Sequence, residues 1–398
     1  MEEIGIHGSG IATAGKLPAR LPAAIAVPGG DDSDLTRRAC NEPAHPYRTP
    51  FSRDGSRVLH ARAFRRLAGK TQVFSRLPNG SLSDHFRSRL THTLEVAQIS
   101  RTLAAALGLN AELAEALALA HDIGHPPFGH AGEKALHHAL KAHGLSFDHN
   151  LHALRIVTWF EERYASFRGL NLTLGVREGI VKHSRDYTLG QHPELADYFL
   201  DRFPPLEAQL IDLTDEIAYT TSDLDDGLDS GILSLEQVRA GVPLFRGFHD
   251  AALRQFPAAS AKLTACEALK QMLNALATDL MAETHRQVTA SGAATLDDVR
   301  LAPRRLVALS AEMEAQRAEA KRFLYASLYN SPVMEESHRH ADQVVTALFS
   351  AFCADPTQMP ADHQAQIANE GLARTVADYL AGMTDAYIEQ AWLRIGKN

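Results

Sequence analysis

The sequence predicts an all-α fold, and three observations support that prediction. Apolar residues recur at offsets of three and four over long stretches, as on one face of a helix. Convincing alternation of apolar and polar residues, which strands show, is absent. Gly and Pro gather between the periodic stretches. We therefore expect a helical bundle with additional helices after it.

Composition limits the class of protein. The chain has 398 residues, 45% of them hydrophobic, which is enough to bury a large core. No apolar run approaches the roughly 18 residues that cross a bilayer, and the N-terminus lacks the basic start of a signal peptide, so we expect a cytoplasmic protein without membrane contact. The three cysteines are far apart, which argues against a disulfide framework.

We divide the chain into three parts. Residues 1–44 are rich in Gly, Pro and Ala without a sustained period and are expected to form a flexible N-terminal arm. Residues 45–232 hold the motifs described below and form the expected catalytic core. Residues 233–398 are expected to be helical and to pack on the core as one continuous domain.

Two consecutive helices are predicted to point histidines inward. Along "RLTHTLEVAQISRTLAAAL" (residues 89–107), His92 extends a stripe of apolar residues spaced by three and four. After Asn110, a plausible N-cap, "AELAEALALAHD" places His121 on the face of Leu113 and Leu117. Each histidine alone could have a purely structural role, because buried imidazoles often form a hydrogen bond with a backbone carbonyl.

The stretch "HDIGHPPFGH" (residues 121–130) ends the second helix, because Gly124 and two prolines cannot continue it. A new helix is expected from about His130. Further helices are expected at about 150–167, 175–184 and 204–229, and several after Phe256.

A divalent metal would satisfy both inward histidines. Together with Asp122 they offer two nitrogens and a carboxylate, a set that suits Mn, Fe, Co, Ni, Zn or Mg. A fourth ligand is expected from residues 207–232. One helical face there carries the acidic and aromatic residues Asp212, Glu216, Tyr219, Asp223 and Asp226.

Spacing alone leaves that fourth ligand open among Asp223, Asp225 and Asp226. The other reading of the acidic residues is a solvated helix face without a metal.

Several stretches, in order, resemble one known family. They include "RTPFSRDGSRVLHARAFRRLAGKTQVF", "RSRLTHTLEVAQI", "ALALAHDIGHPPFGHAGEKAL", "FDHNLHALRIV", "LEAQLIDLTDEIAYTTSDLDDGL" and "VADYLAGMTDAY". This set is similar to the dGTP triphosphohydrolase (dGTPase-like) family of the HD-domain superfamily. The resemblance covers roughly residues 47–232 and 319–392, and it implies an HD-domain helical bundle.

The resemblance also implies residue roles and a reaction. It implies His92, His121, Asp122 and Asp223 as metal ligands, His130 and Glu133 as the catalytic pair, and Arg89 as a contact to the triphosphate. The implied reaction converts a deoxynucleoside triphosphate (dNTP) and water to the deoxynucleoside and tripolyphosphate. It implies a divalent metal, Mg²⁺ or Mn²⁺ first among those named above, and a homo-oligomer.

Other residues are assigned from their chemistry or their place near these motifs. His125 is assigned to the catalytic group as a supporting residue, and His149 and Tyr219 are assigned to the substrate. Phosphate contacts are also assigned to four cations, each of which has a surface salt bridge as its alternative: Arg53, Arg66, Lys70 and Lys182. No Walker A sequence is present, so arginine, lysine and metal would have to hold the triphosphate.

Two rival functions remain at this point. One is another HD-domain phosphohydrolase, acting on a nucleoside monophosphate or a signalling nucleotide. The other is a non-catalytic nucleotide or nucleic-acid-binding protein, because residues 48–101 hold eleven Lys and Arg against three acids. Weak binding of single-stranded nucleic acid through that segment would fit either an enzyme or a binding module.

Overall fold

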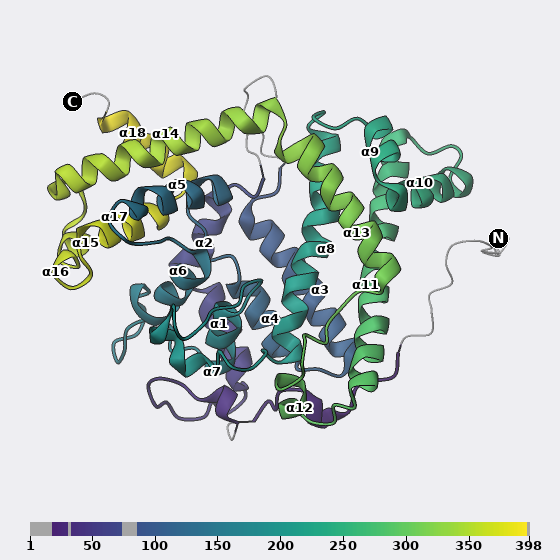
Figure 1. Cartoon of the computed structure of the whole chain (residues 1–398), viewed down its shortest axis with the longest axis horizontal. Helices are drawn as coiled ribbons and strands as arrows, with labels where there is room; N and C mark the ends of the chain where they lie inside the picture. Colours follow the sequence, from purple (N-terminus) through teal and green to yellow (C-terminus); the bar gives the residue numbers. More distant parts are fainter. Residues whose placement is uncertain (1–17, 31–32, 74–85, 396–398) are drawn as a thin grey trace.

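A computed structural model describes residues 18–30, 33–73 and 86–395 of the chain. Over these residues the secondary structure is helical, and the only β contacts are isolated bridges such as Thr71 with Ser88 (Figure 1). The predicted all-α fold is therefore confirmed. None of the described helices has the length and apolar content needed to cross a membrane.

The helices fall into two groups along the chain. The first group is α1 (Pro50–Leu59), α2 (Arg62–Arg66), α3 (Arg89–Leu107), α4 (Ala111–Ala120), α5 (Gly129–Lys141), α6 (His149–Arg155), α7 (Leu174–Val181) and α8 (Leu206–Asp229). The second group is α9 (Leu235–Gly241), α10 (Pro243–Gln255), α11 (Ala261–Ser291), α12 (Leu296–Arg300), α13 (Ala311–Leu324), α14 (Pro332–Ala354), α15 (Ala361–Gln364), α16 (Ile367–Glu370), α17 (Leu372–Ala381) and α18 (Asp385–Ile395).

Local sequence explains where the two central helices begin and end. The Ser88 hydroxyl accepts a hydrogen bond from the Thr91 amide and caps α3, and Gly108 ends that helix in the left-handed region at φ 81°. The Asn110 side chain accepts the Leu113 amide at 3.0 Å and caps α4, as its sequence predicts. These caps fix the ends of the two helices that carry the inward histidines.

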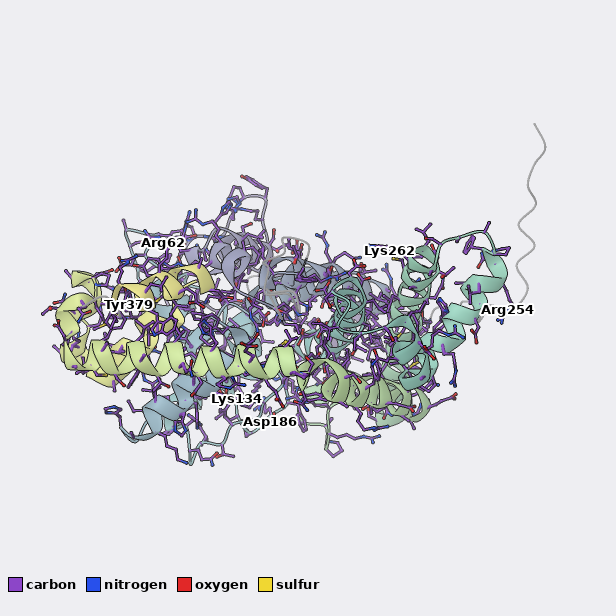
Figure 2. All side chains as sticks on the ribbon, turned by 90° about the horizontal axis from the view of Figure 1, so that it is seen from above. Arg62, Lys134, Asp186, Arg254, Lys262 and Tyr379 are labelled. Carbon is purple, nitrogen blue, oxygen red and sulfur yellow. The ribbon has the colours of Figure 1, made fainter. Side chains whose placement is uncertain are left out.

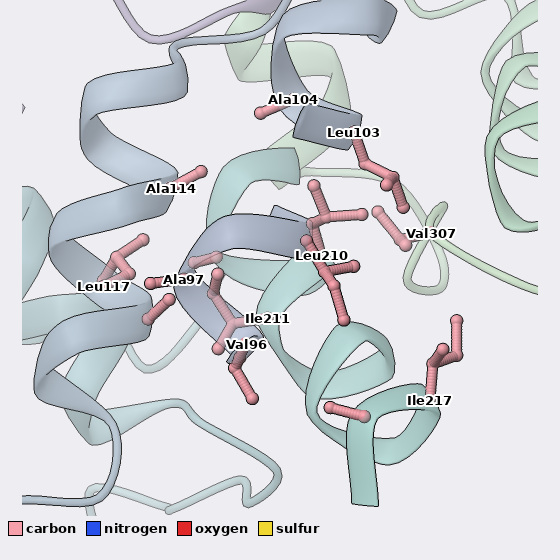
Figure 3. Close-up of a cluster of buried hydrophobic side chains, with 14 of the residues drawn as sticks. Val96, Ala97, Leu103, Ala104, Ala114, Leu117, Leu210, Ile211, Ile217 and Val307 are labelled. Atoms are coloured by element: carbon pink, nitrogen blue, oxygen red, sulfur yellow. The ribbon is translucent and has the colours of Figure 1, made fainter. Parts of the chain in front are cut away.

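The main core lies between α3, α4 and α8 (Figure 3). Val96 and Leu103 of α3 are buried there with Leu117 of α4 and with Leu210 and Ile217 of α8. Burial of each large aliphatic side chain stabilises the fold by about 1.5–3 kcal/mol. Because the same core contains buried residues before and after position 232, the second group of helices packs on the first.

A second core lies under the C-terminal helices. Leu136 and Leu140 of α5 pack there with Leu348 of α14 and Leu380 of α17. In Figure 1 the long helix α14 runs across one edge of the molecule beside α5 and α17. Figure 2 shows Tyr379 and Arg62 at one end of the molecule and Arg254, from α10, at the opposite end.

Part of the expected N-terminal arm packs on the helical core. Ile25 and Val27 are buried, and the Val27 amide donates to the carboxylate of Glu207 in α8 at 2.9 Å. The Leu21 amide also donates to the Leu107 carbonyl at 2.8 Å. Apolar residues separated by Gly and Pro can therefore line a core without forming a long helix. Residues 1–17 lie outside the described part.

Two helix predictions differ from the structure. The helix expected over 150–167 ends by Phe160, and the segment up to Gly169 turns back through two isolated bridges. The prediction also left out α9 and α10, which fill positions 235–255. Pro243 begins α10 because proline suits the first turn of a helix, so it marks a start here.

Candidate metal centre and active site

Three helices bring two histidines and two aspartates together. His92 comes from α3, His121 and Asp122 follow α4 directly, and Asp215 comes from α8. The Nε2 atom of His92 lies 2.7 Å from Oδ1 of Asp215. The Nε2 atom of His121 lies 3.7 Å from the same oxygen and 3.6 Å from Oδ1 of Asp122. These four side chains are called the metal cluster below.

Ligand atoms of His92, His121 and Asp215 lie within 4.8 Å of one another, so one divalent ion could bind all three. Ligand atoms bound at 2.0–2.2 Å and about 90° apart are separated by about 3 Å, close to the distances within the cluster. The Nδ1–H group of His121 donates to the Ala118 carbonyl at 2.6 Å, which leaves the Nε2 lone pair directed at the carboxylates. That Nε2 atom is buried and has no hydrogen-bond partner among the described residues. A bound ion would satisfy it.

Electrostatics keeps both carboxylates charged. Burial alone would raise the pKa of Asp215, but its contact with His92 and the nearby imidazoles hold that pKa well below its usual range. Burial opposes ionisation of Asp122 too, and the Arg89 guanidinium 3.0 Å away outweighs it and lowers the pKa. Burial lowers the pKa of His121, which favours the neutral imidazole that metals bind.

The structure does not bring the predicted fourth ligand, Asp223, together with His92 and His121. Asp223 lies eight residues after Asp215, which is about 12 Å along the helix axis. Its Oδ2 atom accepts a hydrogen bond from the Tyr329 hydroxyl, and burial raises its pKa to about 7. Asp215, rather than Asp223, lies beside His92 and His121. Its signal was in the sequence, because Asp215 is three residues after Asp212 and four before Tyr219, on the same helical face.

A second group of polar side chains adjoins the metal cluster. Glu133 of α5 lies between two imidazoles, with its Oε2 atom 3.2 Å from His130 Nδ1 and its Oε1 atom 2.8 Å from His149 Nδ1. The His149 ring stacks on that of His125 with centroids 4.0 Å apart. His125 Nδ1 in turn lies 2.9 Å from Asp122 Oδ1, so the two groups are continuous.

These side chains differ in exposure in a way that suits proton transfer. The His130 side chain is 70% exposed, whereas that of Glu133 is 14% exposed. Burial would raise the pKa of Glu133, but hydrogen bonds with His130 and His149 lower it, so the carboxylate is ionised. Ligand atoms of His125, Glu133 and His149 also lie within 4.8 Å of one another, a grouping that can hold a cation.

The Gly–Pro stretch after Asp122 shapes the junction between these groups. Phe128 and Gly129 both have positive φ, 62° and 56°, and turn the chain into α5 just before His130. A Cβ atom on Gly129 would lie 2.7 Å from Nη2 of Arg89. The turn therefore needs glycine for its backbone and for the guanidinium beside it.

Three of the residues assigned to the substrate lie at the site. Arg89 is 2% exposed and pairs with Asp122 of the metal cluster. His149 belongs to the second group. Tyr219 follows Asp215 by four residues on α8, so both lie on one face.

The other four cations assigned to phosphate have protein partners in the structure, and nothing in it places them against a phosphate. The buried Lys70 ammonium donates to the carbonyls of His125 and Ala381. The buried Lys182 pairs with Glu178 and donates to two carbonyls. Arg53 bonds Glu42 and the Pro43 carbonyl, and Arg66 bonds the Gly382 carbonyl. Some Lys and Arg side chains donate to backbone carbonyls that have no backbone donor. The sequence alone does not distinguish such residues from those that bind phosphate.

One further residue of the site was missed. The His183 ring lies 5.3 Å from that of His121, and its Nδ1 atom lies 2.9 Å from Oδ1 of Asp212. Asp212 also pairs with Arg305 at 2.9 Å. The His183 ring thus packs against the His121 ring and is held by Asp212. His183 lies two residues after the end of α7, outside any periodic apolar pattern that would have pointed to it.

Comparison with known proteins agrees with this geometry. The HD domain family matches residues 89–220, which include every member of the metal cluster, and the phosphohydrolase-associated domain matches residues 307–394. A deoxyguanosinetriphosphate triphosphohydrolase-like protein of Thiobacillus denitrificans is 46% identical over 355 residues, 89% of this chain and 92% of that protein. This chain belongs to the deoxyguanosinetriphosphate triphosphohydrolase-like family.

Two other relatives in this family carry the same description. The protein from Azoarcus sp. is 46% identical over 349 residues, and the one from Brucella canis is 43% identical over 367 residues. Those matches cover 86% and 88% of this chain, and 90% of each relative. The chain is therefore an HD-domain hydrolase, and these relatives match most of its length.

Proposed function

We propose that this protein hydrolyses deoxynucleoside triphosphates to the deoxynucleoside and tripolyphosphate, with a divalent metal at His92, His121, Asp122 and Asp215. The observation that carries the proposal is the continuity between the metal cluster and the His130–Glu133 pair through Asp122 and His125. A phosphoryl group held at the cluster would lie beside a histidine oriented for proton transfer. The relatives' description as dGTP triphosphohydrolase-like supports this substrate class.

The metal, when bound, supplies a Lewis acid that polarises a phosphoryl oxygen and lowers the pKa of a bound water. The protein side chains provide proton transfer, orientation of the catalytic histidine and stabilisation of charge. The Nδ1 atom of His130 faces Glu133, so its Nε2 atom is free to take a proton from the attacking water or to give one to the departing 5′-oxygen. The Glu133 carboxylate holds the imidazole in that orientation, and the Arg89 guanidinium offsets negative charge on the phosphoryl oxygens.

Further parts of the proposal concern the ion and the assembly. Mg²⁺ and Mn²⁺ are the first candidates for the ion, while Fe, Co, Ni and Zn also suit two nitrogens and two carboxylates. We also propose a homo-oligomer and a cytoplasmic location.

Product analysis tests the proposal. Each dNTP, alone and in mixtures, is incubated with the protein and either Mg²⁺ or Mn²⁺, and the products are separated by anion-exchange chromatography. We expect deoxynucleoside and tripolyphosphate, and neither product with Asp122→Ala. Release of monophosphate or pyrophosphate would point to another HD-domain phosphohydrolase. The absence of turnover, combined with salt-dependent nucleotide or single-strand affinity that survives in Asp122→Ala, would favour a binding protein.

A further inference from the structure

The C-terminal turn Ala381–Asp385 contacts segments beside the active site. In the sequence, the turn is far from those segments. Asp385, the first residue of α18, accepts the Phe128 amide at 3.0 Å through Oδ1. Its Oδ2 atom accepts the Thr71 amide at 2.9 Å and also the Thr71 hydroxyl. One carboxylate thus joins two segments that are 57 residues apart.

Both segments lead directly to site residues. Phe128 has a left-handed backbone and comes two residues before His130. On the other side, the Lys70 carbonyl accepts the Arg89 amide at 3.1 Å, and Thr71 forms a bridge with Ser88, the cap of α3. The turn therefore contacts the start of α5 and, through one short segment, the start of α3.

Neighbouring contacts reinforce the same arrangement. The Lys70 ammonium donates to the carbonyls of His125 and Ala381, which ties the Gly–Pro stretch to the turn a second time. The Arg66 guanidinium donates to the Gly382 carbonyl at 2.9 Å. Capping of α18 does not need Asp385, because the Thr384 hydroxyl accepts the Tyr387 amide.

We propose that Asp385 is a positioning residue that holds Phe128 and thereby fixes the His130–Glu133 pair against the metal cluster. This inference rests on the proposed function for its kinetic part. A positive φ is costly for a residue other than glycine, so Phe128 needs external partners to hold its conformation, and Asp385 accepts its amide. A displacement of about 1 Å of a catalytic group costs roughly 100-fold in rate.

The test compares Asp385→Asn with Asp355→Asn. The amide keeps the size of the side chain but turns one of its two acceptors into a donor. Asp355 is the matched control, because it also accepts a threonine amide and hydroxyl, those of Thr357, in a turn of the same C-terminal region. Two readouts are used: hydrogen–deuterium exchange of residues 123–131 without substrate, and kcat and KM for the dNTP that the wild type prefers.

We expect faster exchange of residues 123–131 and a fall in kcat of about tenfold to 100-fold with little change in KM for Asp385→Asn. Neither change is expected for Asp355→Asn. Unchanged exchange, or unchanged kcat, would overturn the proposal. If Asp385→Asn does not fold, Thr71→Val takes its place, since it removes only the hydroxyl bond to Asp385, and the same changes are expected on a smaller scale.

Failure of the proposed function gives a different result. A wild type that turns over no dNTP removes the catalytic role of the pair. The exchange comparison still decides whether Asp385 holds Phe128, because it needs no substrate.

Discussion

His92 Nε2 lies 2.7 Å from Oδ1 of Asp215, although the two residues are 123 positions apart in the sequence. Asp223, on the same helix, contacts Tyr329 instead. The proposed fourth ligand, Asp215, thus differs from its acidic neighbours in its position on α8, and that difference can be measured.

Asp215→Ala should abolish tight metal binding, whereas Asp223→Asn should retain it. Loss of a partner outside the ligand set typically costs about 10–100-fold in metal affinity, and loss of a ligand costs more. Isothermal titration of Mn²⁺ into protein stripped with EDTA measures both affinities. Equal losses in the two variants would contradict the assignment of Asp215.

Glu133→Gln should lower kcat while leaving metal affinity unchanged. The amide cannot accept from both His130 and His149 as the carboxylate does, so the catalytic histidine loses its orientation. A positioned acid–base group accelerates a reaction by about 10²–10⁴-fold, so we expect kcat to fall by up to that factor. His138→Asn, at an exposed position of the same helix, serves as the control. A normal rate in Glu133→Gln would remove the pair from the mechanism.

Gly129→Ala should impair both stability and activity, whereas Gly144→Ala should impair stability alone. Both glycines have positive φ, 56° and 69°, and an alanine there costs about 1–2 kcal/mol. At Gly129 the added Cβ would also meet the Arg89 guanidinium, but at Gly144 it would meet nothing within 4 Å. Urea unfolding and kcat/KM separate the two effects, and equal kcat/KM in the two variants would refute the role of Arg89.

Lys70 should make stability rise with pH above neutrality. Burial lowers the pKa of Lys70 to about 7 in the folded protein, while the unfolded chain keeps a value of about 10.4. Between these values the unfolded state binds more protons, so raising the pH favours the folded state by up to about 1.4 kcal/mol per unit.

Urea unfolding at pH 7 and pH 9 tests this expectation. The free energy of unfolding of the wild type should increase relative to that of Lys70→Met, in which the charge is gone. Lys134→Met, at an exposed position of α5, should behave as the wild type does. A difference between wild type and Lys70→Met that stays constant with pH would show that Lys70 keeps its charge across this range.

Local patterns account for the parts of the fold and site that could be predicted. The N-cap of α4, and the inward direction of His92 and His121, follow from side-chain type and helical period alone. The position of Asp215 opposite His92 does not, because it depends on how α8 crosses α3. Neither the sequence of α3 nor that of α8 indicates that these two helices lie close together.

The partners of the buried lysines could not be predicted from the sequence either. Lys70 and Lys182 lie in sequence beside the site motifs, yet their ammonium groups are used by backbone carbonyls. Residues 18–30 show it too, since Ile25 and Val27 are buried by segments that come much later in the chain. In each case the partner is distant in sequence, and only the packed structure identifies it.

If the metal cluster binds an ion, its origin in three separate helices would link metal supply to the lifetime of the protein. An ion that binds α3, α4 and α8 together binds the folded state and not the unfolded chain, so by mass action it stabilises the fold by about 2.7 kcal/mol at 100 times its Kd. Starvation for that metal would then increase the unfolded fraction open to proteases. Loss of metal would thus reduce the amount of the enzyme as well as its rate.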